Sequence, residues 1–382
     1  MVSVASPARP TPGRLEQVST RVAFFIAGFG VAAWAPLVPF AKARTGIDAD
    51  TLGLLLLCLG MGSMVTMPLA GAMTARFGCR LVIAVSTVLL CITLPLLATL
   101  SSLLLLLPAL FVFGAAVGSI DVSVNIQAII VERASGRPMM SGFHGLFSLG
   151  GIVGAAGMTA LLSAGASPLA ATVCASAALV AALAVAVAHL LPYGSRREGP
   201  AFALPRGVVL FIGILCFIVF LAEGAVLDWS AVFLTSVRGM EPSHAGLGYA
   251  VFASAMTLGR LTGDGIVARF GDRRVIIFGG LCAAAGFAAT GLPHREAALL
   301  GFVLVGVGCA NIVPVLFTGV GRQTVMPETV AVPAITTLGY AGILVGPAAI
   351  GVVAHASSLT TAFLLLAILL LGVAASGCLP RL

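Results

Sequence analysis

The chain has 382 residues, of which 60% are hydrophobic and only 9% are charged. Soluble globular domains carry about 25% charged residues, so the composition excludes a soluble protein and indicates one whose solvent is a lipid bilayer. The net charge of +7 comes from arginines in the turns between apolar segments. They form no continuous basic stripe, so we expect no nucleic-acid partner.

Twelve apolar segments follow one another, each long enough to cross a bilayer as a helix. They are expected at residues 21–40, 51–74, 81–100, 103–130, 139–163, 167–191, 207–235, 244–267, 274–292, 297–320, 330–354 and 358–379. The short alternating segments of a membrane barrel are absent. The sequence therefore predicts an all-α integral membrane protein of two six-helix bundles. The expected divisions are a disordered cytosolic tail at 1–19, an N-terminal bundle at 20–191, a cytosolic linker at 192–206 and a C-terminal bundle at 207–380.

The arginines predict the orientation of these helices. If the amino terminus is cytosolic, the outside loops hold only Lys42, Arg44, Arg238 and Arg295. The inside loops then receive Arg76, Arg80, Arg133, Arg137, Arg196, Arg197, Arg206, Arg269, Arg273, Arg274 and Arg322. Because positive charge accumulates on cytoplasmic loops, we expect both termini and the central linker in the cytosol.

The two halves repeat each other. The tetrapeptide Ala-Arg-Phe-Gly occurs at 75–78 and at 268–271, 193 positions later. Trp34-Ala-Pro in the first segment corresponds to Trp229-Ser-Ala in the seventh. A glycine pair at positions 150 and 154 of the fifth segment corresponds to one at 342 and 346 of the eleventh. Both groups of six have the same orientation, which indicates parallel repeats about an axis along the membrane normal.

On these features the chain resembles transporters of the major facilitator superfamily over nearly its full length. The turn after the second segment is similar to the superfamily signature G-x-x-x-D-R-x-G-x-R through Gly71, Arg76, Gly78 and Arg80. The aspartate of that signature is replaced by alanine in both copies, and Asp264, one turn earlier, is expected to compensate in the second. The stretches HGLFSLGG (144–151) and AEGAVLDW (222–229) resemble the YbjJ-like group of bacterial inner-membrane members.

The resemblance implies a multi-pass protein of the bacterial inner (plasma) membrane that works by alternating access around a site between the first, fourth, seventh and tenth helices. The sequence lacks G-x-x-x-x-G-K-[ST], and Lys42 is its only lysine, so it carries no phosphate-binding loop for ATP. The eight cysteines form no C-x-x-C pair, and we expect no metal or cofactor. We therefore expect transport driven by a gradient and no enzyme activity.

Ionisable residues inside the membrane are costly, which makes them functional candidates. Asp121 and Asn125 share a face of the fourth segment and are predicted to contact substrate or carry a proton. The alternative is a structural hydrogen bond to a neighbouring helix. His144, on the fifth segment, is predicted to pair with Asp121 in a proton step or, alternatively, to serve as a structural hydrogen-bonding residue.

Glu223 is expected deepest in the membrane and is the first choice for proton coupling. Asp228 faces another way on the same segment and is expected to close an outer gate. At the inner face Glu132 is expected to pair with Arg76 or Arg80. Arginines and carboxylates at this face are expected to act in gating together: Arg76, Arg80, Glu132, Asp264, Arg269 and Arg273.

Trp34 and Trp229 are either interfacial anchors or an inward-facing pair that closes the outer gate. Asn311 and Tyr340, with Trp34, are weaker candidates for substrate contact. Arg260 and Asp264 lie four residues apart on the eighth segment. We expect them to pair with each other near the inner surface, in preference to clamping an anionic substrate.

The sequence thus predicts a monomeric secondary transporter of a small organic solute, with protons and the bilayer as its further partners. Without an evident basic cluster in the site, a neutral or cationic, sugar-like solute is favoured. The alternatives are a drug or metabolite exporter that works by proton antiport, a membrane sensor that does not transport, and a polytopic membrane enzyme. A membrane enzyme would need clustered histidines and carboxylates, and the five histidines are scattered.

Overall fold

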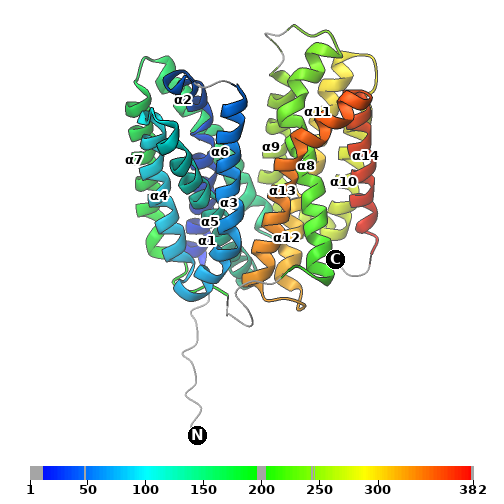
Figure 1. The fold of residues 1–382 in the computed structure, drawn as a ribbon. Helices are drawn as coiled ribbons and strands as arrows, with labels where there is room; N and C mark the ends of the chain where they lie inside the picture. Colours follow the sequence, from blue (N-terminus) through cyan, green and yellow to red (C-terminus); the bar gives the residue numbers. More distant parts are fainter. Residues whose placement is uncertain (1–11, 47–48, 196–203, 242–243, 245, 380–382) are drawn as a thin grey trace.

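The computed structural model describes residues 12–46, 49–195, 204–241, 244 and 246–379, and the regular elements in these ranges are all helical. Long helices follow from the sequence because a backbone in lipid must satisfy its own hydrogen bonds, and a helix does so within one segment. Figure 1 shows two groups of helices side by side, α1 to α7 in one and α8 to α14 in the other.

The first half consists of α1 (Arg14–Ala32), η1 (Ala35–Leu37), α2 (Val38–Thr45), α3 (Ala49–Phe77), α4 (Cys79–Thr99), α5 (Leu103–Ser135), α6 (Met140–Ser163), α7 (Pro168–Ala186) and η2 (Val187–His189). The second half consists of α8 (Gly207–Ser236), α9 (Leu247–Phe270), α10 (Asp272–Thr290), α11 (Arg295–Cys309), α12 (Ile312–Arg322), α13 (Glu328–Ala356) and α14 (Leu359–Ser376).

These elements confirm the twelve predicted segments. Two segments are interrupted: α1, η1 and α2 form the first, and α11 and α12 form the tenth. Among the described residues, 11 helical spans are long and apolar enough to cross a membrane. The remaining segment is α9, which carries Arg260, Asp264 and Arg269 within its length.

The prediction of a disordered tail at 1–19 is wrong for its last part, because α1 begins at Arg14. Glu16 accepts the backbone N–H of Gly13 at 2.7 Å, which satisfies one of the free donors at the helix start. Residues 1–11 lie outside the described part of the chain, as do linker residues 196–203. The division into domains at the predicted residues stays a prediction.

The repeated turn has the same backbone in both halves. Gly78 has φ 84° and ψ 160°, and Gly271 has φ 77° and ψ 159°. A positive φ of this kind is open to glycine and strained for residues with a Cβ. The last residue of the Ala-Arg-Phe-Gly tetrapeptide therefore ends one helix and begins the next in both copies.

The two halves contact each other toward one end of the molecule, which we call the termini end because α1 begins and α14 ends there (Figure 1). Helix α3 packs on α13 and α6 packs on α9 across the interface. Toward the opposite end the ribbons of the two halves lie farther apart (Figure 1). Across this interface, Ser148 and Gly142 of α6 are bonded to residues of α9.

Candidate transport site

The break in the tenth segment creates a hydrogen-bond acceptor in the middle of the protein. In a continuous helix the carbonyl of Ala310 would accept the N–H of residue 314, but Pro314 has none. The Nε of Arg260 donates to this carbonyl instead, at 3.3 Å. The Nδ2 of Asn311 donates to the carbonyl of Gly259 at 3.1 Å, so α9 is bound to the break at two points.

Arg260 joins three helices from both halves. Its guanidinium donates to the Oγ of Ser148 on α6 at 2.9 Å and to Oε1 of Glu223 on α8 at 3.3 Å. The side chains of Arg260 and Glu223 are only 7% and 16% exposed. A buried ion pair is costly to form and more costly to break on one side, so this charge is held in place by its partner.

The predicted pair between Arg260 and Asp264 is wrong. Arg260 turns toward the helix break and Glu223, which offer a free carbonyl and a buried negative charge. Asp264 accepts the backbone N–H of Gly142 at 2.9 Å, in the first turn of α6. The first N–H groups of a helix have no partner within that helix, so a carboxylate is a favourable acceptor there.

Gly71 occupies the position of Asp264 in the other copy of the repeat. A Cβ on Gly71 would overlap the carbonyl oxygen of Thr329, near the start of α13. A Cβ on Gly142 would likewise overlap the carboxylate of Asp264. Two of the helix pairs that join the halves, α3 with α13 and α6 with α9, therefore each bring one helix against the first turns of another.

The predicted pairing of Glu132 with Arg76 or Arg80 is also wrong. Glu132 accepts the backbone N–H groups of Met139 and Met140, each at 2.7 Å, and so caps the start of α6. Its other oxygen accepts the hydroxyl of Thr318 on α12 at 2.6 Å, which links the two halves. Because three neutral donors already surround this carboxylate, it needs no arginine beside it.

The arginines of the repeated turns bind within their own halves. Arg80 donates to the carbonyls of Leu190 and Ala188 at 2.8 and 2.7 Å, which holds the turn against η2. Arg273 donates to the carbonyl of Cys378 at 3.4 Å, beyond the end of α14. The other two arginines lie over neighbouring phenyl rings: Arg76 over Phe77 and Arg269 over Phe270.

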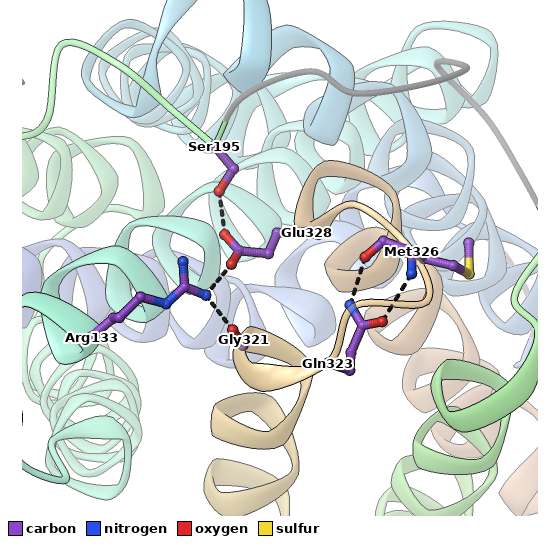
Figure 2. A network of polar contacts seen from close by, with 6 residues as sticks. All are labelled: Arg133, Ser195, Gly321, Gln323, Met326 and Glu328. Atoms are coloured by element: carbon purple, nitrogen blue, oxygen red, sulfur yellow. Dashed lines mark hydrogen bonds and ion pairs between the residues drawn. The ribbon is translucent and has the colours of Figure 1, made fainter.

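A polar network that the sequence did not predict closes the termini end (Figure 2). Arg133, at the end of α5, binds both the carboxylate of Glu328 on α13 and the carbonyl of Gly321 on α12. Ser195, in the segment between the halves, donates to the same carboxylate. The network thus joins the first half, the second half and the link between them. Its members lie 133 and 195 positions apart in the chain, beyond the reach of any local pattern.

Asp121 and Asn125 lie together on α5, as their spacing predicts. The Nδ2 of Asn125 donates to Oδ1 of Asp121 at 3.2 Å and to its backbone carbonyl at 2.9 Å. Tyr340 lies on α13 of the other half, a helix that packs against α5. Its ring packs edge-on against Phe220, with centroids 6.4 Å apart. Candidate substrate-binding residues thus lie on two helices of opposite halves that pack together.

His144 is buried among aromatic rings. The rings of Phe24 and Phe317 lie 5.3 and 5.6 Å from its centroid, and Phe143 stacks on Phe24. Among the described residues its Nε2 has no hydrogen-bond partner. The predicted pair with Asp121 is not formed: among the described residues the side chain bonded to the Asp121 carboxylate is that of Asn125, and His144 is surrounded by phenyl rings.

The two tryptophans and Asp228 occupy separate places. Trp34 is 5% exposed at the end of α1, whereas Trp229 packs against Gly351 of α13 in its own half. Within the part of the chain that the structure describes, the two rings make no contact and neither Nε1 has a partner. Asp228 is exposed on α8. The outer-gate role stays a prediction for all three.

Comparison with known proteins identifies the family. The family model of the Major Facilitator Superfamily matches residues 22–324. The chain belongs to this superfamily. An uncharacterized MFS-type transporter of Yersinia pestis is 59% identical over 368 residues, which cover 96% of each chain. The membrane protein MosC of Rhizobium meliloti is 32% identical over 349 residues, 89% of this chain and 84% of the relative.

A solved structure with the same fold is that of the fucose:proton symporter FucP of E. coli. It superposes with a TM-score of 0.79 at 15% identity and covers 95% of this chain and 97% of its own. The superfamily member described here is accordingly a multi-pass membrane transporter and not an enzyme. The narrower YbjJ-like resemblance stays a prediction.

Proposed function

We propose that this transporter moves a small organic solute across the bacterial inner membrane by alternating access and couples that movement to protons through Glu223. The observation that carries the proposal is the buried pair of Glu223 and Arg260, whose guanidinium also binds Ser148 of the other half. The pair lies in the middle of α8 and α9, and α8 is long and apolar enough to cross a membrane, so a charged group there is a functional candidate.

The contacts between the halves define one state of the transport cycle. Gly142 with Asp264, Glu132 with Thr318 and Arg133 with Glu328 all lie at the termini end. With both termini in the cytosol, as the arginine distribution predicts, this is a state closed to the cytosol and outward-facing. The inward-facing state then requires that these contacts separate.

A proton on Glu223 would act on this equilibrium directly. Removing one charge of a buried pair leaves the other unpaired, at a cost of about 3–5 kcal/mol. The protonated protein would therefore favour an arrangement in which Arg260 reaches water or another anion, and its bond to Ser148 would be given up. Such a difference between two states is what couples a ligand to a conformational change.

We place the coupling proton on Glu223 in preference to His144. The imidazole of His144 lies between the phenyl rings of Phe24 and Phe317 and has no charged side chain bonded to it among the described residues. Ser148, one turn along α6 from His144, holds the guanidinium of Arg260, so protonation of His144 would add a second positive charge on the same helix face. Like charges in a buried site disfavour that step.

The test is uptake into proteoliposomes under an imposed pH gradient, with a panel of sugars, amines and drug-like cations. Glu223→Gln should abolish gradient-driven accumulation while leaving exchange of solute across the membrane, which needs no net proton movement. Glu296→Gln is the matched control, because this exposed carboxylate pairs with Arg295 at the opposite end. Accumulation that persists in Glu223→Gln would contradict the proposal. The sign of the productive gradient distinguishes symport from proton antiport.

A further inference from the structure

We propose that Asp121 and Asn125 form the binding site for a protonated primary or secondary amine on the transported solute. The inference rests on the proposed transport function and adds the chemical class of the substrate. Two acceptors on one face of α5 carry it: the amide oxygen of Asn125, which has no hydrogen-bond donor among the described residues, and the carboxylate of Asp121, which accepts the Asn125 amide but has no cationic partner there.

The amide of Asn125 is oriented by its own hydrogen bonds. Both bonds from Nδ2 go to Asp121, one to the side chain and one to the backbone carbonyl. Because both bonds are donated, the amide atom beside Asp121 is the nitrogen, and the other amide atom is the oxygen, Oδ1. Asn125 is 1% exposed, and within the described chain no donor reaches its Oδ1. Buried polar atoms are nearly always paired, so an orphaned acceptor at this depth indicates a donor supplied from elsewhere.

Asp121 differs from the other carboxylates of the interior. Glu223 has Arg260, Asp264 has the amide of Gly142, and Glu132 has two amides and a hydroxyl. Asp121 has only the amide of its helix neighbour, and in the described residues no arginine, lysine or histidine forms an ion pair with it. A carboxylate in an apolar segment calls for a cation or a proton.

The two groups together specify the ligand's chemistry. An ammonium group supplies a positive charge for the Asp121 carboxylate and N–H donors both for that carboxylate and for the orphaned amide oxygen of Asn125. A quaternary ammonium carries the charge without the donors, and a carboxylate carries the wrong sign. Helix α13 of the other half, which carries Tyr340, packs against α5.

The experiment is equilibrium binding to the purified full-length protein by calorimetry, with triads that share one skeleton. Glucosamine, glucose and glucuronate form the first triad. Ethanolamine, ethylene glycol and glycolate form the second, with choline as the quaternary probe. We expect an amine to bind at least about 10-fold more tightly than its hydroxyl and carboxylate partners, the usual size of a charge-assisted hydrogen bond.

Variants assign the binding to this site. Asp121→Asn should weaken the amine by at least about 10-fold, and Asn125→Ala should weaken it less, whereas Glu296→Gln should leave it unchanged. Each variant is first checked for the wild-type melting temperature, and Asn125→Ala carries the test if Asp121→Asn fails to fold. Equal affinity for the three members of every triad, or an amine unaffected by both variants, would overturn the proposal. So would the absence of any amine binder up to about 10 mM, ten times the usual upper KM.

Binding and transport fail in distinguishable ways. Amine binding without flux in proteoliposomes would contradict the proposed transport cycle and keep the site. Gradient-driven flux confined to neutral or anionic solutes would keep the transport cycle and remove the site. Because calorimetry needs no membrane and no gradient, its result does not depend on proton coupling.

Discussion

The guanidinium of Arg260 donates to the hydroxyl of Ser148 at 2.9 Å and thereby links the two halves of the protein at the depth of the Glu223 pair. Ser148 lies on α6 and Arg260 on α9, two helices that must separate if the termini end opens. The Arg260–Ser148 contact therefore depends both on the charge of Glu223 and on how the two halves are placed.

Ser148→Ala should shift the population toward the state that is open at the termini end. The lost hydrogen bond is worth about 1.5–3 kcal/mol because its donor is charged, and some of that cost is recovered in the open state, where Arg260 meets water. Hydrogen exchange at the start of α6 should become faster, since the amide of Gly142 is bonded across the interface. Thr159→Ala is the control, because Thr159 bonds only to its own helix. Equal exchange in both variants would contradict this role.

Removing one partner of the buried pair should destabilise the protein more than removing both. Arg260→Met leaves Glu223 unpaired and should lower the free energy of unfolding by about 3–5 kcal/mol. The double variant Arg260→Met, Glu223→Met should recover much of that loss. Thermal unfolding in one detergent, followed as a double-mutant cycle, measures the coupling. Additive losses would show that the two charges do not support each other.

Gly71→Ala should weaken the interface between α3 and α13. The new methyl group would overlap the carbonyl of Thr329 and cost about 1–3 kcal/mol as an overpacked contact. Gly157→Ala is the matched control, because no atom lies within 4 Å of a Cβ built on Gly157, and alanine is the better helix former. We expect the first variant to lower the melting temperature and the second to leave it unchanged or raise it. The reverse order would contradict the close approach.

Exchanging the charges of Arg133 and Glu328 should restore the ion pair, and with it the resistance to proteolysis that either single change removes. Arg133 is 55% exposed on its side chain, so the pair contributes only about 0–1 kcal/mol. Arg133→Glu should nevertheless speed proteolysis of the segment at Ser195, which shares the carboxylate of Glu328 (Figure 2). The double variant with Glu328→Arg should slow cleavage again. A cleavage rate that is the same in the single and double variants would show that this network does not hold the segment.

The sequence predicted features that depend on neighbouring residues. Twelve apolar segments, the repeat and the turn glycines at 78 and 271 all follow from local composition and backbone geometry. The shared face of Asp121 and Asn125 follows from their four-residue spacing. These features need no knowledge of what a segment packs against.

The partners of buried charges could not be obtained in the same way. Arg260 has Asp264 four residues away, yet it binds Glu223 and Ser148, which are 37 and 112 positions distant. The deciding factor is the proline at position 314, which removes a donor from a neighbouring helix and leaves a carbonyl for Arg260. Glu132 likewise caps a helix start that exists only once the loop after α5 has folded. Such pairings depend on tertiary geometry.

Gly71 in one half and Asp264 in the other occupy equivalent positions of the repeat. The contacts that they make across the interface differ in kind. At Gly71 the carbonyl of Thr329 lies so close that steric contact limits how near α3 and α13 can approach. At Asp264 the carboxylate accepts the backbone N–H of Gly142, so separation of α6 from α9 requires that water replace this hydrogen bond. The two halves thus share one sequence plan but hold the equivalent position in different ways, by steric contact at Gly71 and by a hydrogen bond at Asp264.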